Sequence, residues 1–236
     1  MSDFRENARK SLANSSRYIH WAASDFEGAL SDDGIVITQE MCEAVEVYVR
    51  DVMKVCNETG TLKSLMVEVP VTIPRVHDLN WGTPDTRIYS ESNATLYVWD
   101  FKYGHDPIDV VECWQLIEYS LGALDEIING NGLADQHINV CMRVVQPRAF
   151  HQDGICREWT IQASDLRGYA NQLALSAEQS QSDNPPCVAG PWCKNCQALA
   201  DCTTSLNATG RTMDYVEALN ITELDADNRS VAISYL

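Results

Sequence analysis

The sequence has little positive charge. Lysine and arginine together number 17 against 34 aspartates and glutamates, which gives a formal net charge of −17 at pH 7. A field of this sign repels nucleic acid at long range, so it argues against a protein that coats DNA non-specifically. It still allows an enzyme that uses a local basic groove.

The sequence also lacks a long apolar run. No stretch approaches the roughly 18 consecutive apolar residues that a membrane span requires. The first residues, MSDFRENARKSLANSSRY, do not contain the apolar stretch of a secretory signal. We therefore expect a cytoplasmic protein with no membrane partner. Its 236 residues, 45% of them hydrophobic, are enough to bury the core of one large domain.

Cysteine is plentiful, but a disulfide framework is not expected in a chain without an export signal. Five of the nine cysteines are scattered through apolar surroundings, where they read as small buried hydrophobes: Cys42, Cys56, Cys113, Cys141 and Cys156. The other four are crowded into sixteen positions: Cys187, Cys193, Cys196 and Cys202. These four need a separate explanation as thiols or metal ligands.

The hydrophobic pattern predicts alternating helices and strands. Apolar residues at helical spacing predict helices over 14–30, 38–56 and 110–127, and from Ser164 to about 179. Thr38 is a good N-cap for the second of these helices. Runs of β-forming residues predict strands at 65–73, 86–90, 94–102, 138–146 and 157–163.

This order of elements predicts an α/β fold with a central mixed sheet flanked by helices. We expect a core over residues 1–180 and a cysteine-rich metal-binding segment over 181–204. Residues 205–236 have little periodicity and are expected to form a peripheral tail.

One predicted strand combines opposite charges at its end. Asp100 and Lys102 are two residues apart, so their side chains should project from the same face of the strand. Asp85 begins the neighbouring strand, and a hairpin between 86–90 and 95–99 would bring its carboxylate towards Asp100.

Two carboxylates that approach closely raise each other's proton affinity unless a divalent cation lies between them. Oxygen ligands suit magnesium or manganese, which keep several waters and share ligation with a substrate phosphate. Glu68, in the preceding strand, is a further candidate ligand. A lysine beside such a metal can orient the attacking water and offset charge in the transition state. The plainer alternative is an Asp–Lys pair on a solvated strand face, with Asp85 capping a turn.

The next predicted helix carries Gln115 and Tyr119, which lie on one face because they are four residues apart. Taken alone, they fit a satisfied amide and a buried phenol. Their position directly after Asp-Phe-Lys-Tyr-Gly makes them candidates for the same site.

In this order of motifs the sequence resembles the PD-(D/E)xK nuclease superfamily. The closest likeness is to its RecB-like branch, which includes CRISPR-associated exonucleases and a family common in phages. The segments that carry the resemblance are Gly82-Thr83-Pro84-Asp85, Asp100-Phe101-Lys102 and Gln115-Leu-Ile-Glu-Tyr119. The phage family has three further segments, matched here by Tyr103-Gly104, Leu121-Gly122-Ala123-Leu124 and Gln146-Pro147-Arg148.

The resemblance implies a restriction-endonuclease-like core and magnesium- or manganese-dependent hydrolysis of DNA. The enzyme would be an exonuclease or end-processing nuclease, with proteins of phage recombination or replication as further partners. Asp85 and Asp100 would hold the metal and Lys102 would lie by the nucleophilic water. Gln115 and Tyr119 would position the lysine or the substrate backbone.

The resemblance also implies two further metal-binding elements. RecB-like members place a histidine ligand on an early helix, and His20 is the corresponding candidate, although a helix histidine without a role fits equally well. Cys193, Cys196 and Cys202 are similar to a C-terminal trio that holds a four-iron cluster. Relatives supply the fourth cysteine from far upstream, and Cys187 is the local substitute here. Four thiolates suit a 4Fe-4S cluster or zinc, and unligated thiols remain an alternative.

Two other functions are compatible with the sequence. The net charge favours a catalytically weak or inactive nuclease-fold module that binds DNA or a protein partner. An acidic mimic of DNA would also explain the charge, but not the placement of Lys102. Uptake of manganese between Asp85 and Asp100 would discriminate the enzyme from the binding module.

Overall fold

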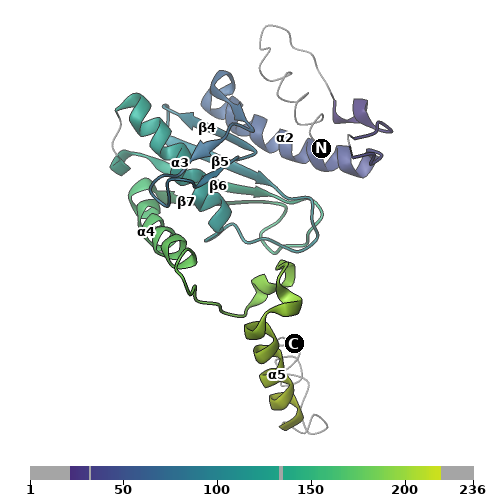
Figure 1. Ribbon diagram of the computed structural model, residues 1–236. Coiled ribbons are helices and arrows are strands. Elements are labelled where there is room, and N and C mark those ends of the chain that lie inside the picture. The colour runs from purple at the N-terminus through teal and green to yellow at the C-terminus, as the bar shows by residue number, and fades with distance from the viewer. Residues whose placement is uncertain (1–21, 32, 133–134, 219–236) are drawn as a thin grey trace. The chain divides into compact units, whose positions relative to one another are not determined.

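The computed structural model describes residues 22–31, 33–132 and 135–218 (Figure 1). The chain divides into two units, Met1–Ala177 and Glu178–Leu236. The larger unit contains a five-stranded sheet in the order β1-β4-β5-β6-β7 and a separate pair of strands, β2-β3. The sheet is mixed, as predicted, because β5 and β6 are parallel while its other neighbours are antiparallel.

The central strands are long and the edge strands are short. The bounds are β1 Met66–Val67, β2 Val71–Thr72, β3 Trp81–Gly82, β4 Thr86–Ser90, β5 Thr95–Phe101, β6 Asn139–Val145 and β7 Cys156–Gln162. The predicted hairpin of β4 with β5 is confirmed, with Thr86 opposite Trp99 and Ser90 opposite Thr95.

The prediction of one continuous strand over 65–73 is wrong. The chain pairs with β4 through β1 and then joins the other sheet as β2. Glu68 interrupts it with a φ of 53°, a left-handed conformation that no strand contains. Pro70 follows, and proline cannot donate a hydrogen bond to a sheet.

The helices are α2 Gln39–Thr59, α3 Trp114–Asn131, α4 Ala163–Ser180 and α5 Thr203–Ala218. Short 3-10 turns occur at η1 Ala23–Phe26, η2 Leu62–Ser64, η3 Asp135–His137, η4 Pro191–Asn195 and η5 Leu199–Asp201. Thr38 caps α2 as predicted, because its Oγ1 accepts a hydrogen bond from the Met41 N–H at 3.3 Å.

Three helix predictions differ from the structure. The expected helix over 14–30 reduces to η1 in its described part, because Leu30 pairs with Val36 as an isolated bridge; residues 14–21 lie outside the described residues. α3 begins at Trp114 rather than at residue 110, since the preceding residues form a loop. Helix α5 forms where the weak periodicity of 203–218 did not predict one.

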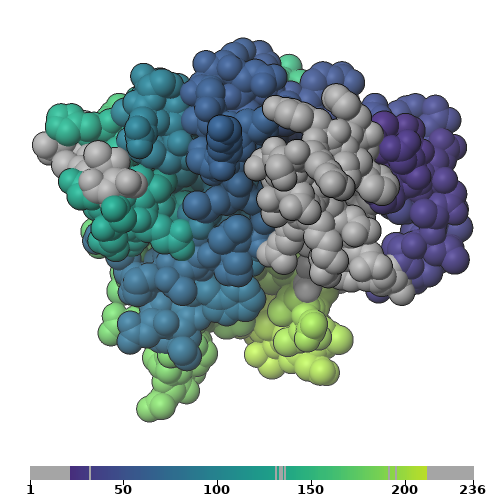
Figure 2. All heavy atoms as spheres, turned by 90° about the horizontal axis from the view of Figure 1, so that it is seen from above, coloured from purple at the N-terminus to yellow at the C-terminus, as the bar shows by residue number. Residues whose placement is uncertain are grey.

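Different helices pack against the two faces of the sheet. On β5, Leu96 and Val98 pack with α3 and α4, whereas Trp99 packs with α2. Alternate residues of a strand point to opposite faces, so Asp100 shares the α3 face with Val98. The space-filling view shows the purple residues that lead into α2 and the teal to green end of α3 at opposite margins (Figure 2).

Helix α3 approaches strand β2 closely at a glycine. A Cβ atom on Gly122 would lie 2.8 Å from the Thr72 carbonyl oxygen. Glycine is therefore required in the Leu-Gly-Ala-Leu segment for this packing. Among the helices of the described residues, none is long and apolar enough to cross a membrane.

Candidate functional site

The register of three neighbouring strands places three acids in one row. β4 pairs with β5 through Thr86 and Trp99, so the next position along brings Asp85 opposite Asp100. β1 pairs with β4 through Val67 and Thr86, so the next position brings Glu68 opposite Asp85. The Glu68 N–H donates to the Asp85 carbonyl oxygen at 3.0 Å, which continues the pairing by one step.

A chain of polar contacts runs from this row into helix α3. Lys102 Nζ lies 2.9 Å from Asp100 Oδ2 and donates to Gln115 Oε1 at 2.7 Å. Gln115 Nε2 in turn donates to the Tyr119 hydroxyl at 2.9 Å. The predicted projection of Asp100 and Lys102 to one side is confirmed, and so is the shared face of Gln115 and Tyr119. The ammonium is held between a carboxylate and an amide.

Asp100 is buried without full hydrogen bonding. Its side chain is 4% exposed. Although Lys102 lies within ion-pair distance, no described residue gives Asp100 Oδ2 a well-directed hydrogen bond. Burial raises the pKa of the Asp100 carboxyl, and the Lys102 ammonium offsets part of this rise. A buried carboxylate oxygen in this state has capacity for a further positive partner.

Asp85 is fixed by the neighbouring strand. Its Oδ2 accepts the Phe101 N–H at 2.7 Å, so the carboxylate lies against the end of β5. Close to it, the Tyr48 hydroxyl donates to Thr86 Oγ1 at 2.5 Å. Burial holds the pKa of the Tyr48 phenol well above its usual value, and the charge of Asp85 adds to this effect, with smaller contributions from Glu68 and Asp100. Tyr48 therefore stays protonated in the field of the three acids.

The glycine of the Gly-Thr-Pro-Asp segment has a packing role. A Cβ atom on Gly82 would overlap the ring of Tyr119. The absence of a side chain lets the β3 backbone lie against that ring and so supports the position of the Tyr119 hydroxyl. Gly82, three residues before Asp85, thus packs against α3, the helix whose Gln115 binds the Lys102 ammonium.

Two of the three acids, Glu68 and Asp85, border a largely apolar pocket. A pocket of about 400 Å³ is lined by Glu68, Asp85 and Tyr48, together with apolar side chains that include Val45, Val49 and Phe101. Next to Lys102 in the chain, the Tyr103 ring is covered by the Arg148 guanidinium at 4.3 Å, and Arg148 also forms an ion pair with Glu40. The surroundings are therefore less basic than a groove that attracts nucleic acid by charge alone.

The predicted site residues are only partly gathered. Lys102, Asp100, Gln115 and Tyr119 form one connected group, and Asp85 and Glu68 lie in register beside it. His20 lies outside the described residues. Within residues 22–31, 33–132 and 135–218, no three His, Cys, Asp or Glu side chains lie close enough together to hold a metal ion.

The smaller unit contains the four crowded cysteines. Cys187 Sγ lies 3.8 Å from Cys202 Sγ, and Cys193 Sγ accepts the Gly190 N–H at 3.4 Å. Cys202 directly precedes α5, and a backbone hydrogen bond from Ser205 lowers the pKa of its thiol, with a smaller contribution from Cys187. The structure thus places two of the four free thiols, Cys187 and Cys202, next to each other.

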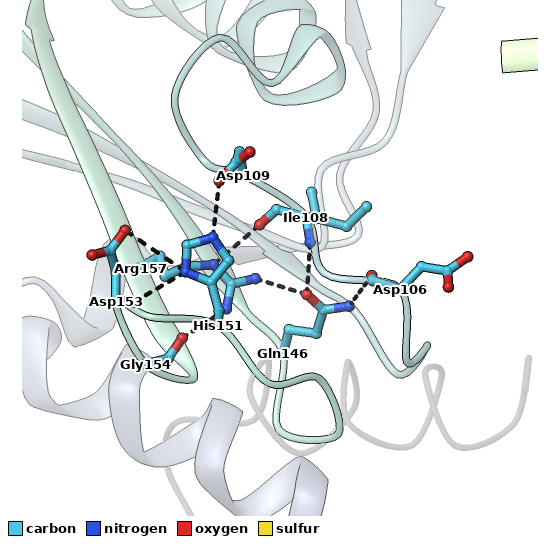
Figure 3. Close-up of polar contacts among 8 residues, drawn as sticks. All are labelled: Asp106, Ile108, Asp109, Gln146, His151, Asp153, Gly154 and Arg157. Carbon is cyan, nitrogen blue, oxygen red and sulfur yellow. Dashed lines mark hydrogen bonds and ion pairs between the residues drawn. The ribbon is translucent and has the colours of Figure 1, made fainter. Parts of the chain in front are cut away.

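Sequence reasoning missed the residues that fasten the loop after Lys102. Gln146 and Arg157 are both buried and contact this loop, and His151 joins them at its outer edge (Figure 3). Gln146 was visible only as part of a resembling segment, and nothing in its spacing indicated a contact across the sheet.

Comparison with known proteins adds a family but no activity. A family model described as "Protein of unknown function (DUF2800)" matches residues 7–231. The chain belongs to this family. No curated protein matches the sequence of this DUF2800 member.

Among solved structures, two similar chains differ strongly in sequence. One is described as "Crystal structure of SSO0001"; it is 14% identical, with 85% of this chain and 79% of that chain covered and a TM-score of 0.37. The other is named a "Putative exonuclease" from Eubacterium rectale; it is 11% identical, with 72% and 65% covered and a TM-score of 0.36. At these values the likeness carries no functional argument.

Proposed function

We propose that this protein is a metal-dependent nuclease of the RecB-like PD-(D/E)xK kind that hydrolyses phosphodiester bonds in DNA. The observation that carries the proposal is the joint placement of Asp85, Asp100 and Lys102. The two aspartates are opposite one another across β4 and β5, and the lysine ammonium lies 2.9 Å from the second. A solvated Asp–Lys pair would not need a carboxylate that is 4% exposed.

The residues present fit a magnesium or manganese ion. Magnesium is usually bound by one or two carboxylates, with waters and substrate phosphates completing its shell. Asp85 and Asp100 supply two carboxylates, and Asp100 Oδ2 is a buried oxygen with unused bonding capacity. Glu68 is a third candidate in the same row, and its positive φ is the kind of strain that clusters at functional sites. A bound divalent cation would stabilise charge on the phosphate and lower the pKa of a water molecule.

The protein's own groups then have separate roles. Lys102 donates hydrogen bonds, so it can orient the attacking water and offset the charge that develops on the phosphate oxygens. Gln115 Oε1 accepts a second hydrogen bond from the ammonium at 2.7 Å, and Tyr119 accepts one from Gln115, so the two side chains fix the position of the ammonium beside Asp100. Hydrolysis joins the water oxygen to phosphorus, breaks the bond to the leaving sugar oxygen and returns a proton to that oxygen.

An assay with end-labelled DNA tests the proposal. Wild-type protein should degrade the DNA in the presence of magnesium or manganese and should be inactive with chelator. Lys102→Met should lower the rate by at least about 100-fold, which is the usual cost of removing a group that stabilises transition-state charge. Exposed Lys63 provides the matched control, and Lys63→Met should cleave as wild type does. Equal cleavage by both variants, or none by wild type, would overturn the proposal.

The smaller unit is proposed to bind a metal through Cys187, Cys193, Cys196 and Cys202. Thiolates about 2.3 Å from one tetrahedral ion lie about 3.8 Å apart, and Cys187 Sγ lies 3.8 Å from Cys202 Sγ. That separation supports a single zinc ion, while the resemblance supports a 4Fe-4S cluster. Metal analysis with a visible spectrum distinguishes them, and Cys187→Ser should lower the metal content. Metal-free wild-type protein would rule out both.

Two observations favour a second candidate function, a nuclease-fold module that binds DNA or a protein without cleaving. The net charge is −17, and the described acids do not form a three-ligand metal group. In that case the protein should bind its partner without metal, and DNA should remain intact at every metal concentration. The cleavage assay above separates the two functions.

A further inference from the structure

The loop between the lysine and its helix partner is held by side chains rather than by regular backbone pairing. It runs from Lys102, the residue after β5, to Cys113, the residue before α3. The Lys102 N–H still donates to the Val145 carbonyl oxygen at 2.9 Å. Beyond it, Gly104, Asp106 and Ile108 bond instead to the side chains of Gln146 and Arg157 (Figure 3).

Gln146 uses its full hydrogen-bonding capacity in this contact. Its Nε2 donates to the carbonyl oxygens of Gly104 at 3.0 Å and Asp106 at 2.8 Å. Its Oε1 accepts the Ile108 N–H at 3.0 Å and Arg157 NH2 at 2.7 Å. A carboxamide has two donors and one oxygen with two lone pairs, so all four positions are filled. The side chain is also 1% exposed, so loss of any partner would leave a buried polar group unpaired.

Arg157 is the second member of the contact. Its guanidinium donates to the carbonyl oxygens of Ile108 at 3.1 Å and Gly154 at 2.7 Å, besides Gln146. The loop backbone therefore interacts with a buried cation that donates these three hydrogen bonds to amide oxygens. This arrangement fixes the loop from the side of strand β7.

His151 closes the outer edge. Its Nδ1 accepts the Asp153 N–H at 3.1 Å, so in the neutral ring the proton is on Nε2, which lies 2.9 Å from Asp109 Oδ1. The histidine thus ties Asp109 of the loop to the turn before β7.

The sheet register links Gln146 directly to the lysine. β5 and β6 are parallel and pair through Phe101 and Val145, so the next position along brings Lys102 beside Gln146. The far end of the same loop leads into α3, whose second residue is Gln115, the amide that binds the lysine ammonium. Fixing the loop therefore fixes both ends of the Lys102–Gln115 contact.

We propose that Gln146 and Arg157 are positioning residues for Lys102: with His151 they hold the loop over residues 102–113 so that the ammonium and Gln115 meet beside Asp100. This inference rests on the proposed nuclease function for its kinetic consequence. The placement of the ammonium is a separate consequence that does not need activity.

The variant Gln146→Glu tests the proposal with little change of shape. Glutamate keeps the two acceptor contacts but replaces two donated hydrogen bonds with oxygen facing oxygen. Gln162→Glu is the matched control, because Gln162 is an exposed glutamine at the other end of the same strand pair, where it donates to Asn139.

The activity-independent measurement is the rate at which Lys102 reacts with an acetylating N-hydroxysuccinimide ester, read by peptide mass spectrometry with exposed Lys63 as internal reference. In wild type and Gln162→Glu, Lys102 should react slowly. In Gln146→Glu it should react several-fold faster, while the rate at Lys63 stays constant. A purely structural role would lower the melting temperature without this change, so an unchanged Lys102 rate in the folded variant would overturn the proposal.

The kinetic measurement adds a second test where wild type cleaves DNA. Gln146→Glu should lower kcat by roughly 10- to 100-fold, the cost of a displaced reacting group, with KM little changed. If wild type does not cleave, the nuclease proposal fails and the acetylation rates still decide the positioning role. If Gln146→Glu does not fold, His151→Ala takes its place, with the same faster reaction of Lys102 expected and an unchanged rate contradicting the proposal.

Discussion

Asp51 of helix α2 and Asp100 of strand β5 lie on opposite sides of the sheet, and their carboxylates have different hydrogen-bond partners. On the α2 face, Asp51 accepts Trp99 Nε1 at 2.8 Å and two nitrogens of Arg143 at 2.9 and 3.0 Å. On the α3 face, Asp100 has the Lys102 ammonium at 2.9 Å but no well-directed hydrogen bond to Oδ2. We call the carboxylate of Asp51 saturated because both of its oxygens accept hydrogen bonds. The carboxylate of Asp100 is not saturated, because its Oδ2 has only the Lys102 ammonium as a partner among the described residues.

The difference distinguishes a structural ion pair from the pair that we propose to be functional. Asp51 and Arg143 are 9% and 12% exposed and join α2 to the central strands. A buried pair with a bidentate arginine fixes one arrangement and leaves no capacity for a ligand. Asp100 Oδ2 can accept a further positive partner, and Asp100 lies opposite Asp85 at the end of the strand pair β4–β5.

The largest expected effect concerns the saturated pair. Asp51→Ala leaves Arg143 and the Trp99 indole N–H buried without their acceptor, so it should lower the free energy of unfolding by about 3 to 5 kcal/mol. Urea denaturation measures this loss, and the cleavage rate per folded molecule should stay unchanged. A loss of less than about 1 kcal/mol, as for exposed pairs, would show that the two aspartates do not differ in this way.

A smaller loss of stability is expected from a change at Gly82, which packs against Tyr119 of α3. Gly82→Ala places a methyl group against the Tyr119 ring, and such overpacking costs about 1 to 3 kcal/mol. Tyr119 is hydrogen-bonded to Gln115, and Gln115 to Lys102. The variant's cleavage rate per folded molecule should therefore also fall, in addition to its loss of stability. Gly130 in α3 has open space around it, so Gly130→Ala should leave cleavage unchanged. Wild-type cleavage by the Gly82 variant would exclude Tyr119 from the site.

The smallest effect is a pH dependence of the free energy of unfolding that comes from Asp100. Burial raises the pKa of Asp100 above its ordinary value of 3.8, so the folded protein binds more protons than the unfolded chain just above that pH. The free energy of unfolding should therefore fall as the pH rises through this window. Asn cannot ionise, so Asp100→Asn should gain stability relative to wild type as the pH rises above the ordinary pKa of 3.8.

Urea unfolding at several pH values checks this prediction, with the exposed Asp78→Asn variant as control. The stability difference between Asp100→Asn and wild type should grow with pH, and it should grow more than the difference between the control and wild type. An Asp100→Asn difference that does not change with pH would mean that Asp100 does not bear a burial penalty.

Much of the central sheet could be predicted from the sequence because its signals are local. Alternating apolar residues placed β5, β6 and β7, and two-residue spacing placed Asp100 and Lys102 on one face. The break at Glu68 was not predicted, since a left-handed residue between β-forming runs has no marker in the sequence. Helix α5 was missed because its apolar periodicity is weak.

The candidate site was predictable only where it follows from spacing along one element. The contact of Lys102 with Gln115 joins residues on a strand and a helix, and the resemblance suggested it before geometry did. The roles of Gln146 and Arg157 depend on the parallel register of β5 with β6 and on a loop conformation. Contacts of this kind are set by tertiary packing, which local propensity does not encode.

Manganese binding tests the central claim most directly. Calorimetric titration of wild type, Asp100→Asn and the exposed control Asp78→Asn compares one buried carboxylate with one on the surface of the same protein. The account predicts that wild type and the control bind the ion equally well, and that Asp100→Asn binds it at least about tenfold more weakly. Binding by Asp100→Asn as tight as that of wild type, or no binding by wild type, would contradict it.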